Sequence, residues 1–292
     1  MKFGDGARTH VLDAHAMNLV VQSPSMTGEH AMALARLGGS STIEQIAPHA
    51  WRVRKAAPAD AIAPYCEHAH IDFAFIPEGR RFADLKLLAM DMDSTLITIE
   101  CIDELGDLAG CKSEIASITA QAMRGELDYP ASLRKRVSLL KGLDEKGLLR
   151  VYDERLRLTP GADTLLAACK RRGVKVLLVS GGFTFFTKRL KQRLGLDYTI
   201  SNVLETRDGR LTGNLIGDIV DAEAKAARFS QVLGELKAGK EESVAIGDGA
   251  NDLKMMARAG VSVAFRAKPV VRAQATCALN WSGLDAVVNL FE

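Results

Sequence analysis

The run Asp91-Met92-Asp93-Ser94-Thr95 combines two carboxylates with two hydroxyls directly after an apolar segment. Asp91 and Asp93 are two positions apart, so in an extended backbone both side chains lean toward the same side. Two carboxylates this close repel each other unless a cation or a shared proton lies between them. A hard divalent cation such as Mg²⁺, which prefers oxygen ligands, removes this conflict. A helix cap formed by Asp93 with Ser94 or Thr95 is the alternative, but it leaves Asp91 unexplained.

A carboxylate such as Asp91 can attack phosphorus and so divide hydrolysis into the formation and the breakdown of an aspartyl phosphate. A second acid must then protonate the leaving alkoxide and activate water. All six histidines lie at or before His70, so the region around Asp91 must transfer protons through carboxylates. This favours Asp93 as the general acid/base and excludes histidine-based schemes. The Ser180 hydroxyl, the Gly181 N–H and one lysine are candidate donors to the phosphoryl oxygens.

Polar segments follow two other apolar runs in the same way. Ser180-Gly181-Gly182 comes after one run, and Gly247-Asp248-Gly249 comes after another. Nearly continuous apolar strands that alternate with helices are typical of a parallel sheet covered on both faces, and ligands bind at the carboxyl ends of such strands. We therefore predict one site at this edge of the sheet. The predicted strands are 85–90, 174–179 and 243–246.

The composition is that of a folded protein without a strongly charged surface. The chain has 292 residues, of which 47% are apolar, and 38 basic side chains balance 36 acidic ones. This balance gives no field of one sign, so we predict a small-molecule partner and neither nucleic acid nor a membrane. Without a membrane span or a secretory signal, we expect a cytoplasmic protein. The five cysteines show no metal-site spacing and are expected to be reduced.

The N-terminal part of the chain has a different order of elements. After residues 1–16, which show no periodicity, the pattern predicts βαββαβ, an order typical of the ferredoxin-like fold. A polar linker at 77–81 ends this part, so we expect a separate domain at 1–84 and an α/β domain at 85–292. The predicted elements are strand 17–21, helix 27–37, strands 41–46 and 50–54, helix 59–68 and strand 71–76.

A long charged segment with helical spacing separates the first two strands of the second domain. It covers residues 99–156, which is far longer than a usual connection, so we expect a helical cap over the site. Later, segments 198–206 and 211–216 flank the turn Asp208-Gly209, which is typical of a hairpin.

Four segments resemble, in the same order, the motifs of the haloacid-dehalogenase-like (HAD) phosphatases. Single strings such as Ser-Gly-Gly are ordinary turns, but four in order identify the chain as a member, with a Rossmannoid parallel sheet. The segments are 91–95, 180–183, Lys225 and 247–252.

The HAD resemblance implies a role for each matching residue. Asp91 is the nucleophile and a Mg²⁺ ligand, and Asp93 is the acid/base, with its backbone carbonyl on the metal. Asp248 is the other metal carboxylate. The remaining matches bind the phosphoryl group or support the metal and phosphate shell: Ser180, Gly181, Lys225, Asn251, Asp252 and Thr95.

The cap segment is similar to the phosphoserine phosphatase family, over residues 91–104 and 122–143. This resemblance implies that Glu100 binds the ammonium group and Arg136 the carboxylate of an amino-acid phosphate, while Met123 and Tyr129 line the pocket. Charge and geometry suit these roles. Taken alone, Glu100 is typical of acids at a helix start, and Arg136 of a solvated basic run.

The resulting hypothesis is hydrolysis of O-phospho-L-serine to serine and phosphate, the last step of serine biosynthesis, with Mg²⁺ as cofactor. One alternative is a HAD enzyme that acts on another small phosphomonoester or transfers the phosphoryl group to homoserine. A second is an amino-acid-sensing regulatory protein with a vestigial phosphatase core. The N-terminal domain resembles ACT-type domains, which leaves homodimer formation and an amino-acid ligand open as its roles.

Overall fold

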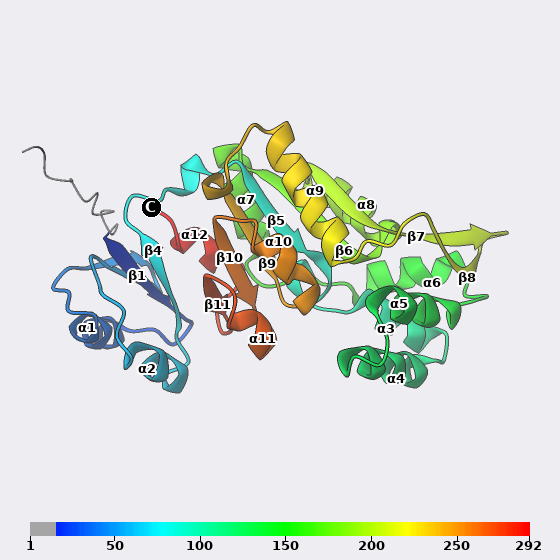
Figure 1. Cartoon of the computed structure of the whole chain (residues 1–292), viewed down its shortest axis with the longest axis horizontal. Helices are drawn as coiled ribbons and strands as arrows, with labels where there is room; N and C mark the ends of the chain where they lie inside the picture. Colours follow the sequence, from blue (N-terminus) through cyan, green and yellow to red (C-terminus); the bar gives the residue numbers. More distant parts are fainter. Residues whose placement is uncertain (1–15) are drawn as a thin grey trace, which may run out of the picture.

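A computed structural model describes residues 16–292, so the expectation for the first 15 residues lies outside the described part. Figure 1 shows three parts in a row. A four-stranded sheet with two helices lies at one end, a seven-stranded sheet covered by helices lies in the middle, and a group of helices lies at the other end. None of the helices in the described part has the length and apolar character needed to cross a membrane.

The first sheet is antiparallel, with strand order β2-β3-β1-β4. Helices α1 (Gly28–Leu37) and α2 (Ile62–His68) cover one face, so the predicted βαββαβ order is confirmed. Helix α2 begins three residues later than predicted, because a start at Ala59 would place Pro64 in the helix interior, where its missing N–H costs a hydrogen bond. The strands are β1 (Met17–Gln22), β2 (Ile43–Ala47), β3 (Ala50–Val53) and β4 (Asp72–Pro77).

The second sheet has the strand order β11-β10-β9-β5-β6-β7-β8, and its pairs are parallel except β7 with β8. The predicted strands 85–90, 174–179 and 243–246 correspond to β5, β6 and β9, and β5 lies between the other two. Two further strands, β10 and β11, were not predicted. The strands are β5 (Leu87–Asp91), β6 (Lys175–Phe183), β7 (Tyr198–Arg207), β8 (Arg210–Ile216), β9 (Ser243–Gly247), β10 (Val261–Phe265) and β11 (Cys277–Leu279).

Helices cover both faces of this sheet, as its fully buried strands β5, β9 and β10 require. Side chains of α7 (Ala162–Arg172) and α8 (Thr184–Leu194) belong to the core of one face. Side chains of α9 (Ala222–Glu235) and α10 (Leu253–Met256) belong to the core of the other. The chain continues from β5 to β6 on one side and, after β8, returns to β9 on the other side of β5, so the carboxyl end of β5 is the topological switch point at which ligands bind.

The long insertion is helical, as predicted, and rests on the predicted hairpin. The Gly142 N–H donates to the Leu211 carbonyl at 2.8 Å, and the Leu211 N–H donates to the Leu143 carbonyl at 2.9 Å. We call the helices of this insertion the cap, and Figure 1 shows β7 and β8 reaching from the sheet to them. The cap helices are α3 (Cys101–Leu108), α4 (Lys112–Met123), α5 (Tyr129–Ser138) and α6 (Glu145–Arg150), and two short helices near the C-terminal end are α11 (Pro269–Arg272) and α12 (Ala286–Asn289).

Candidate active site

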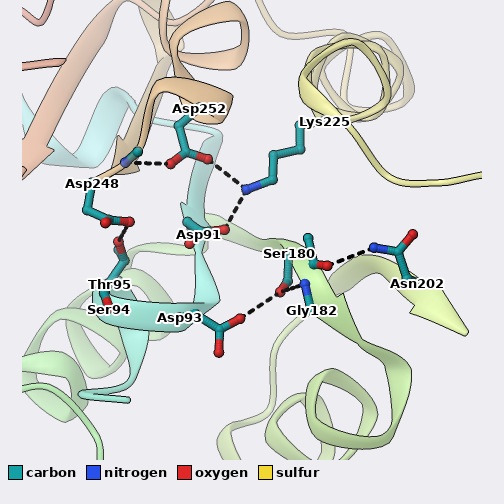
Figure 2. Close-up of polar contacts among 12 residues, drawn as sticks. Asp91, Asp93, Ser94, Thr95, Ser180, Gly182, Asn202, Lys225, Asp248 and Asp252 are labelled. Carbon is teal, nitrogen blue, oxygen red and sulfur yellow. Dashed lines mark hydrogen bonds and ion pairs between the residues drawn. The ribbon is translucent and has the colours of Figure 1, made fainter. Parts of the chain in front are cut away.

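Asp91 is the last residue of the central strand β5, and a tight turn over residues 92–96 follows it. Ser94 adopts the left-handed conformation in this turn, with φ of 56°, and its N–H donates to the Ile99 carbonyl at 3.2 Å. A non-glycine residue in this region is strained, so the surrounding structure must hold the turn in place. Figure 2 shows the result, in which Asp91 at the end of β5 and Asp93 in the turn after it lie beside Ser180 of β6.

Lys225 reaches Asp91 from the buried face of α9. Asp221 caps this helix by accepting the Ala224 N–H at 2.9 Å. Lys225 lies on the same face as Phe229 and Val232, at the spacing of an amphipathic helix, and none of the three has exposed surface. The helix therefore carries the ammonium group into the core beneath the site.

The Lys225 ammonium group joins two carboxylates, as Figure 2 shows. Its Nζ donates to Asp91 Oδ1 at 2.6 Å and to Asp252 Oδ1 at 2.8 Å. Burial lowers the pKa of Lys225, but the negative charges of Asp252 and Asp91 raise it by a larger amount. The pKa of Lys225 therefore lies above its usual value. Burial raises the pKa of Asp91 and the lysine opposes this effect. One oxygen of Asp91 is held by Lys225, and Oδ2 is left for chemistry.

Asp248 completes a cluster of three carboxylates with Asp91 and Asp252, in which one oxygen of each lies within 4.8 Å of the others. The Thr95 hydroxyl donates to Asp248 at 3.4 Å, and burial together with the charge of Asp252 raises the pKa of Asp248 to about 6. A single lysine cannot balance three carboxylates. The excess of negative oxygen ligands fits a hard divalent cation.

The Asp93 side chain points away from this cluster. Its Oδ1 accepts the Cys101 N–H at the start of α3 at 2.9 Å, and its Oδ2 lies 3.4 Å from the Ser180 hydroxyl. Burial raises the pKa of Asp93, which suits a group that must hold and release a proton. Asp93 thus contacts the first N–H of α3, but the Ser94 and Thr95 hydroxyls bond to Glu100 and Asp248, so the helix-cap alternative holds only for this one contact of Asp93.

The segment Ser180-Gly181-Gly182 is not a loop after β6, as we expected, but part of the strand. Its register with β7 shifts between Val179 and Phe183, so the segment bulges toward the site. The buried Ser180 hydroxyl accepts the Gly182 N–H at 2.8 Å. A Cβ atom on Gly181 would lie 2.1 Å from the Tyr129 hydroxyl, so only glycine permits the cap to approach this closely.

The structure brings most of the predicted residues around one cavity of about 160 Å³, which we call the catalytic cavity. Ser180, Lys225, Thr95 and Asp252 lie behind its wall as buried supports. Met123 does not line this cavity and is 66% exposed on the cap. The predicted residues that do line it are Asp91, Asp93, Glu100, Tyr129, Arg136, Gly181, Asp248 and Asn251.

Glu100 and Arg136 differ from the charged residues next to them in sequence. Glu104 and Asp107 both form ion pairs with Arg155, whereas Glu100 lines the cavity and accepts the Ser94 hydroxyl at 2.7 Å. The surrounding protein and the charge of Asp93 raise the pKa of Glu100 to about 7.

Arg136 is half-buried at the cavity wall, while its neighbours Arg134 and Lys135 are exposed. The solvated-run interpretation therefore holds for those two residues and not for Arg136.

Two polar residues near the site were missed. Lys268 lines the catalytic cavity. Asn202 is buried, donates to the Gly181 carbonyl at 2.8 Å and accepts the Val220 N–H at 2.8 Å, so it holds the Gly181 peptide in place. Neither residue lies in a segment whose residue types suggested chemistry. Both are held in place by backbone groups about twenty positions away, and such contacts leave no pattern in the sequence.

Known proteins resemble this chain over both its sequence and its fold. The family model of haloacid dehalogenase-like hydrolases matches residues 88–257. A phosphoserine phosphatase from Polaromonas sp. (strain JS666) is 56% identical over 215 residues, which cover 72% of this chain and 91% of that protein. The chain belongs to the phosphoserine phosphatase family of these hydrolases. A second model, a domain of unknown function (DUF4072), matches residues 19–62.

Solved structures of this family share the architecture. The unliganded crystal structure of a probable phosphoserine phosphatase from Vibrio cholerae has a TM-score of 0.83 and 37% identity, and the match covers 94% of this chain and 86% of that one. A substrate-bound phosphoserine phosphatase complex matches with a TM-score of 0.67 and 38% identity, over 71% of this chain and 99% of that one. Membership makes the chain a phosphoric monoester hydrolase and disfavours the vestigial regulatory protein.

Proposed function

We propose that the chain hydrolyses O-phospho-L-serine to L-serine and phosphate, as the last step of serine biosynthesis. The observation that carries this proposal is the catalytic cavity, in which Asp91 and Asp93 share about 160 Å³ with Glu100 and Arg136. The carboxylates supply phosphoryl chemistry, while Glu100 and Arg136 match the ammonium and carboxylate groups of one small amino acid. A cavity of this size suits such a substrate.

The first half-reaction uses both aspartates. Asp91 Oδ2 attacks phosphorus, an O–P bond to the enzyme forms, and the ester O–P bond breaks. Asp93 donates its proton to the departing serine oxygen, for which its raised pKa prepares it. In the second half, Asp93 takes a proton from water, whose oxygen attacks phosphorus and releases phosphate from Asp91.

We propose Mg²⁺ as the cofactor, held by the carboxylates of Asp91 and Asp248 and by the Asp93 carbonyl. The support is the cluster of carboxylate oxygens, which Lys225 balances only in part. When bound, the cation supplies positive charge to the phosphoryl oxygens. The Gly181 N–H and Asn251 line the same cavity and are proposed as further phosphate contacts.

We further propose that residues 1–84 form a ferredoxin-like, ACT-type domain, that 85–292 form the hydrolase, and that 99–156 form its cap. The four-stranded antiparallel sheet and the βαββαβ order support the first assignment. The five cysteines are all free thiols, which suits the cytoplasm. An amino-acid ligand of the first domain and a homodimer stay predictions, which calorimetry with serine and a measured solution mass would test.

The test of the proposed function is phosphate release by the purified full chain. With Mg²⁺, L-phosphoserine should be turned over faster than D-phosphoserine, phosphothreonine or a sugar phosphate, and Asp91→Asn should abolish turnover. Equal rates across the panel would refute the substrate assignment, and full activity of Asp91→Asn would refute the mechanism. Added homoserine should yield no phosphohomoserine; its appearance would favour the phosphotransferase alternative.

A further inference from the structure

A second cavity of about 690 Å³ between the cap and the hydrolase core adjoins the catalytic cavity, and we call it the outer cavity. Four residues line both cavities and therefore lie between them. Tyr129 and Arg136 come from cap helix α5, and Asn251 and Lys268 come from the core. We call these four residues the neck. The neck thus places two cations between the two cavities, Arg136 from the cap and Lys268 from the core.

The two cations of the neck are free to bind a substrate. Among residues 16–292, neither Arg136 nor Lys268 forms an ion pair, whereas Lys254, which lines only the outer cavity, pairs with Glu223 at 2.6 Å. Arg136 only donates to the Ser132 carbonyl of its own helix, at 3.4 Å. A cation without a partner beside a cavity is available for an anion.

The backbone holds Lys268 next to the catalytic carboxylates. Its N–H donates to the Asp248 carbonyl at 3.3 Å, and its own carbonyl accepts the Val271 and Arg272 N–H groups at 2.9 and 3.1 Å, which starts α11. The root of the side chain is thereby anchored on both sides. The Lys268 side chain is exposed, like those of Arg134 and Lys135, but unlike them it lines the catalytic cavity.

Of the charged groups of phosphoserine, only the carboxylate is left as a partner for Lys268. The phosphoryl group belongs with Asp91 and the ammonium group with Glu100, so the substrate carboxylate is the anion that remains near the neck. We propose that Lys268 is a specificity-determining residue, which binds the substrate carboxylate from the core while Arg136 binds it from the cap. The carboxylate then ties the cap to the core. This inference rests on the proposed function.

The test compares two substrates that differ only in the carboxylate, L-phosphoserine and O-phosphoethanolamine. Lys268→Met should raise KM for phosphoserine roughly tenfold, the effect of one charge-assisted hydrogen bond, with a smaller change in kcat. KM for phosphoethanolamine should change by less than about twofold, because this substrate has no carboxylate for Lys268 to bind. Lys268→Arg should keep most of the phosphoserine affinity. Lys254→Met is the matched control and should leave both substrates unaffected.

Two results would overturn the proposal. Equal losses on both substrates would show that Lys268 acts on the charge of Asp248 instead of on the substrate carboxylate. An unchanged KM for phosphoserine would show that the lysine is only solvated. The wild-type chain is measured first, because its failure to release phosphate from phosphoserine would refute the proposed function. Native-like unfolding of Lys268→Met confirms that a loss is not a folding defect.

Discussion

Lys225 combines a structural role with a chemical one, because its ammonium group has no exposed surface and contacts Asp91 and Asp252. Burying a charge is costly unless it is paired, and the same holds for both carboxylates. Each of the three groups therefore depends on the other two. The lysine also orients Asp91, since it occupies Oδ1 of a side chain that lines the catalytic cavity.

Replacing Lys225 with methionine removes the charge and keeps the apolar stem. Two buried carboxylates then lack a counter-ion, so we expect the free energy of unfolding to fall by about 3–5 kcal/mol and phosphate release to be lost. Added Mg²⁺ should restore part of the stability, because it replaces positive charge. Urea unfolding with and without Mg²⁺ measures both effects. Lys254→Met removes an exposed pair with Glu223 and should cost at most about 1 kcal/mol.

The Glu100 pKa of about 7 predicts a pH dependence of substrate selection. Below this pH the carboxyl group of the free enzyme is protonated and no longer attracts an ammonium group. Lowering the pH from about 8 to about 6 should therefore lower kcat/KM for phosphoserine severalfold relative to phenyl phosphate, which has no ammonium group. The ratio removes changes common to both substrates. Glu100→Gln should make the ratio independent of pH; a ratio that still titrates would assign the effect to another group.

The individual residues differ in how much of their role the sequence reveals. Lys225 shares helical spacing with Phe229 and Val232, so the pattern alone marks it as buried, although we identified it by resemblance. Lys268 and Asn202 carry no such signal. Their positions depend on the carbonyls of Asp248 and Gly181, and long-range backbone contacts leave no periodicity in the chain.

At the scale of elements, strand β8 supports the cap. Gly213 in this strand has φ of 86°, and a Cβ atom there would lie 3.1 Å from the Lys141 Cβ and 3.2 Å from the Ser138 carbonyl. The hairpin thus contacts the end of α5, the helix whose first residue is Tyr129 and which carries Arg136. A change in the hairpin should therefore shift α5 and, with it, the neck residues Tyr129 and Arg136.

Gly213→Ala should destabilise this contact. The left-handed conformation and the close approach to Ser138 together should cost about 1–3 kcal/mol of unfolding free energy, and KM for phosphoserine should rise as α5 shifts. Gly217→Ala is the control, because Gly217 has φ of 77° with nothing within 4 Å of its Cβ position. Gly217→Ala therefore introduces the backbone strain without a close contact to the cap. Identical KM values for the two variants would contradict the coupling between hairpin and neck.

The order of elements was largely predictable, and the exceptions have physical causes. Strand β10 is an apolar run, Val261–Phe265, that periodicity alone cannot separate from a helix segment. Strand β11 has three residues, which is too short for a pattern. The segment Ser180-Gly181-Gly182 has low strand propensity, and it became strand because β6 continues to Phe183, which pairs with Asn202 of β7.

In the whole molecule, the N-terminal sheet is joined to the hydrolase through polar contacts of buried groups. Asp72 of β4 accepts the N–H groups of Asn280 and Ser282, at 2.7 and 2.8 Å, directly after β11. On the same side, Ala74 and Ile76 belong to the apolar core that the hydrolase forms. One face of the sheet is thus covered by α1 and α2, and the other contacts the hydrolase, so the two parts should unfold together.

Arg52 offers the sharpest test of this joint unfolding. Its buried guanidinium donates to the carbonyls of Asn289 and Phe291, at 3.2 and 2.7 Å, so Arg52→Met leaves two carbonyls without their donor. We expect a loss of about 1–3 kcal/mol in unfolding free energy. The neighbouring Arg54 pairs with Glu292 at 2.8 Å in a more exposed position, and Arg54→Met should cost at most about 1 kcal/mol.

Urea unfolding followed by tryptophan fluorescence measures both variants, because Trp51 lies in the first sheet and Trp281 lies at the contact with Asp72. A single transition that moves to lower urea for Arg52→Met shows that the contact couples the two parts. If the N-terminal sheet instead unfolds in a separate step in the wild-type chain, the interface contributes little to stability. The domain would then be attached by its linker alone, and phosphate release should be insensitive to Arg52→Met.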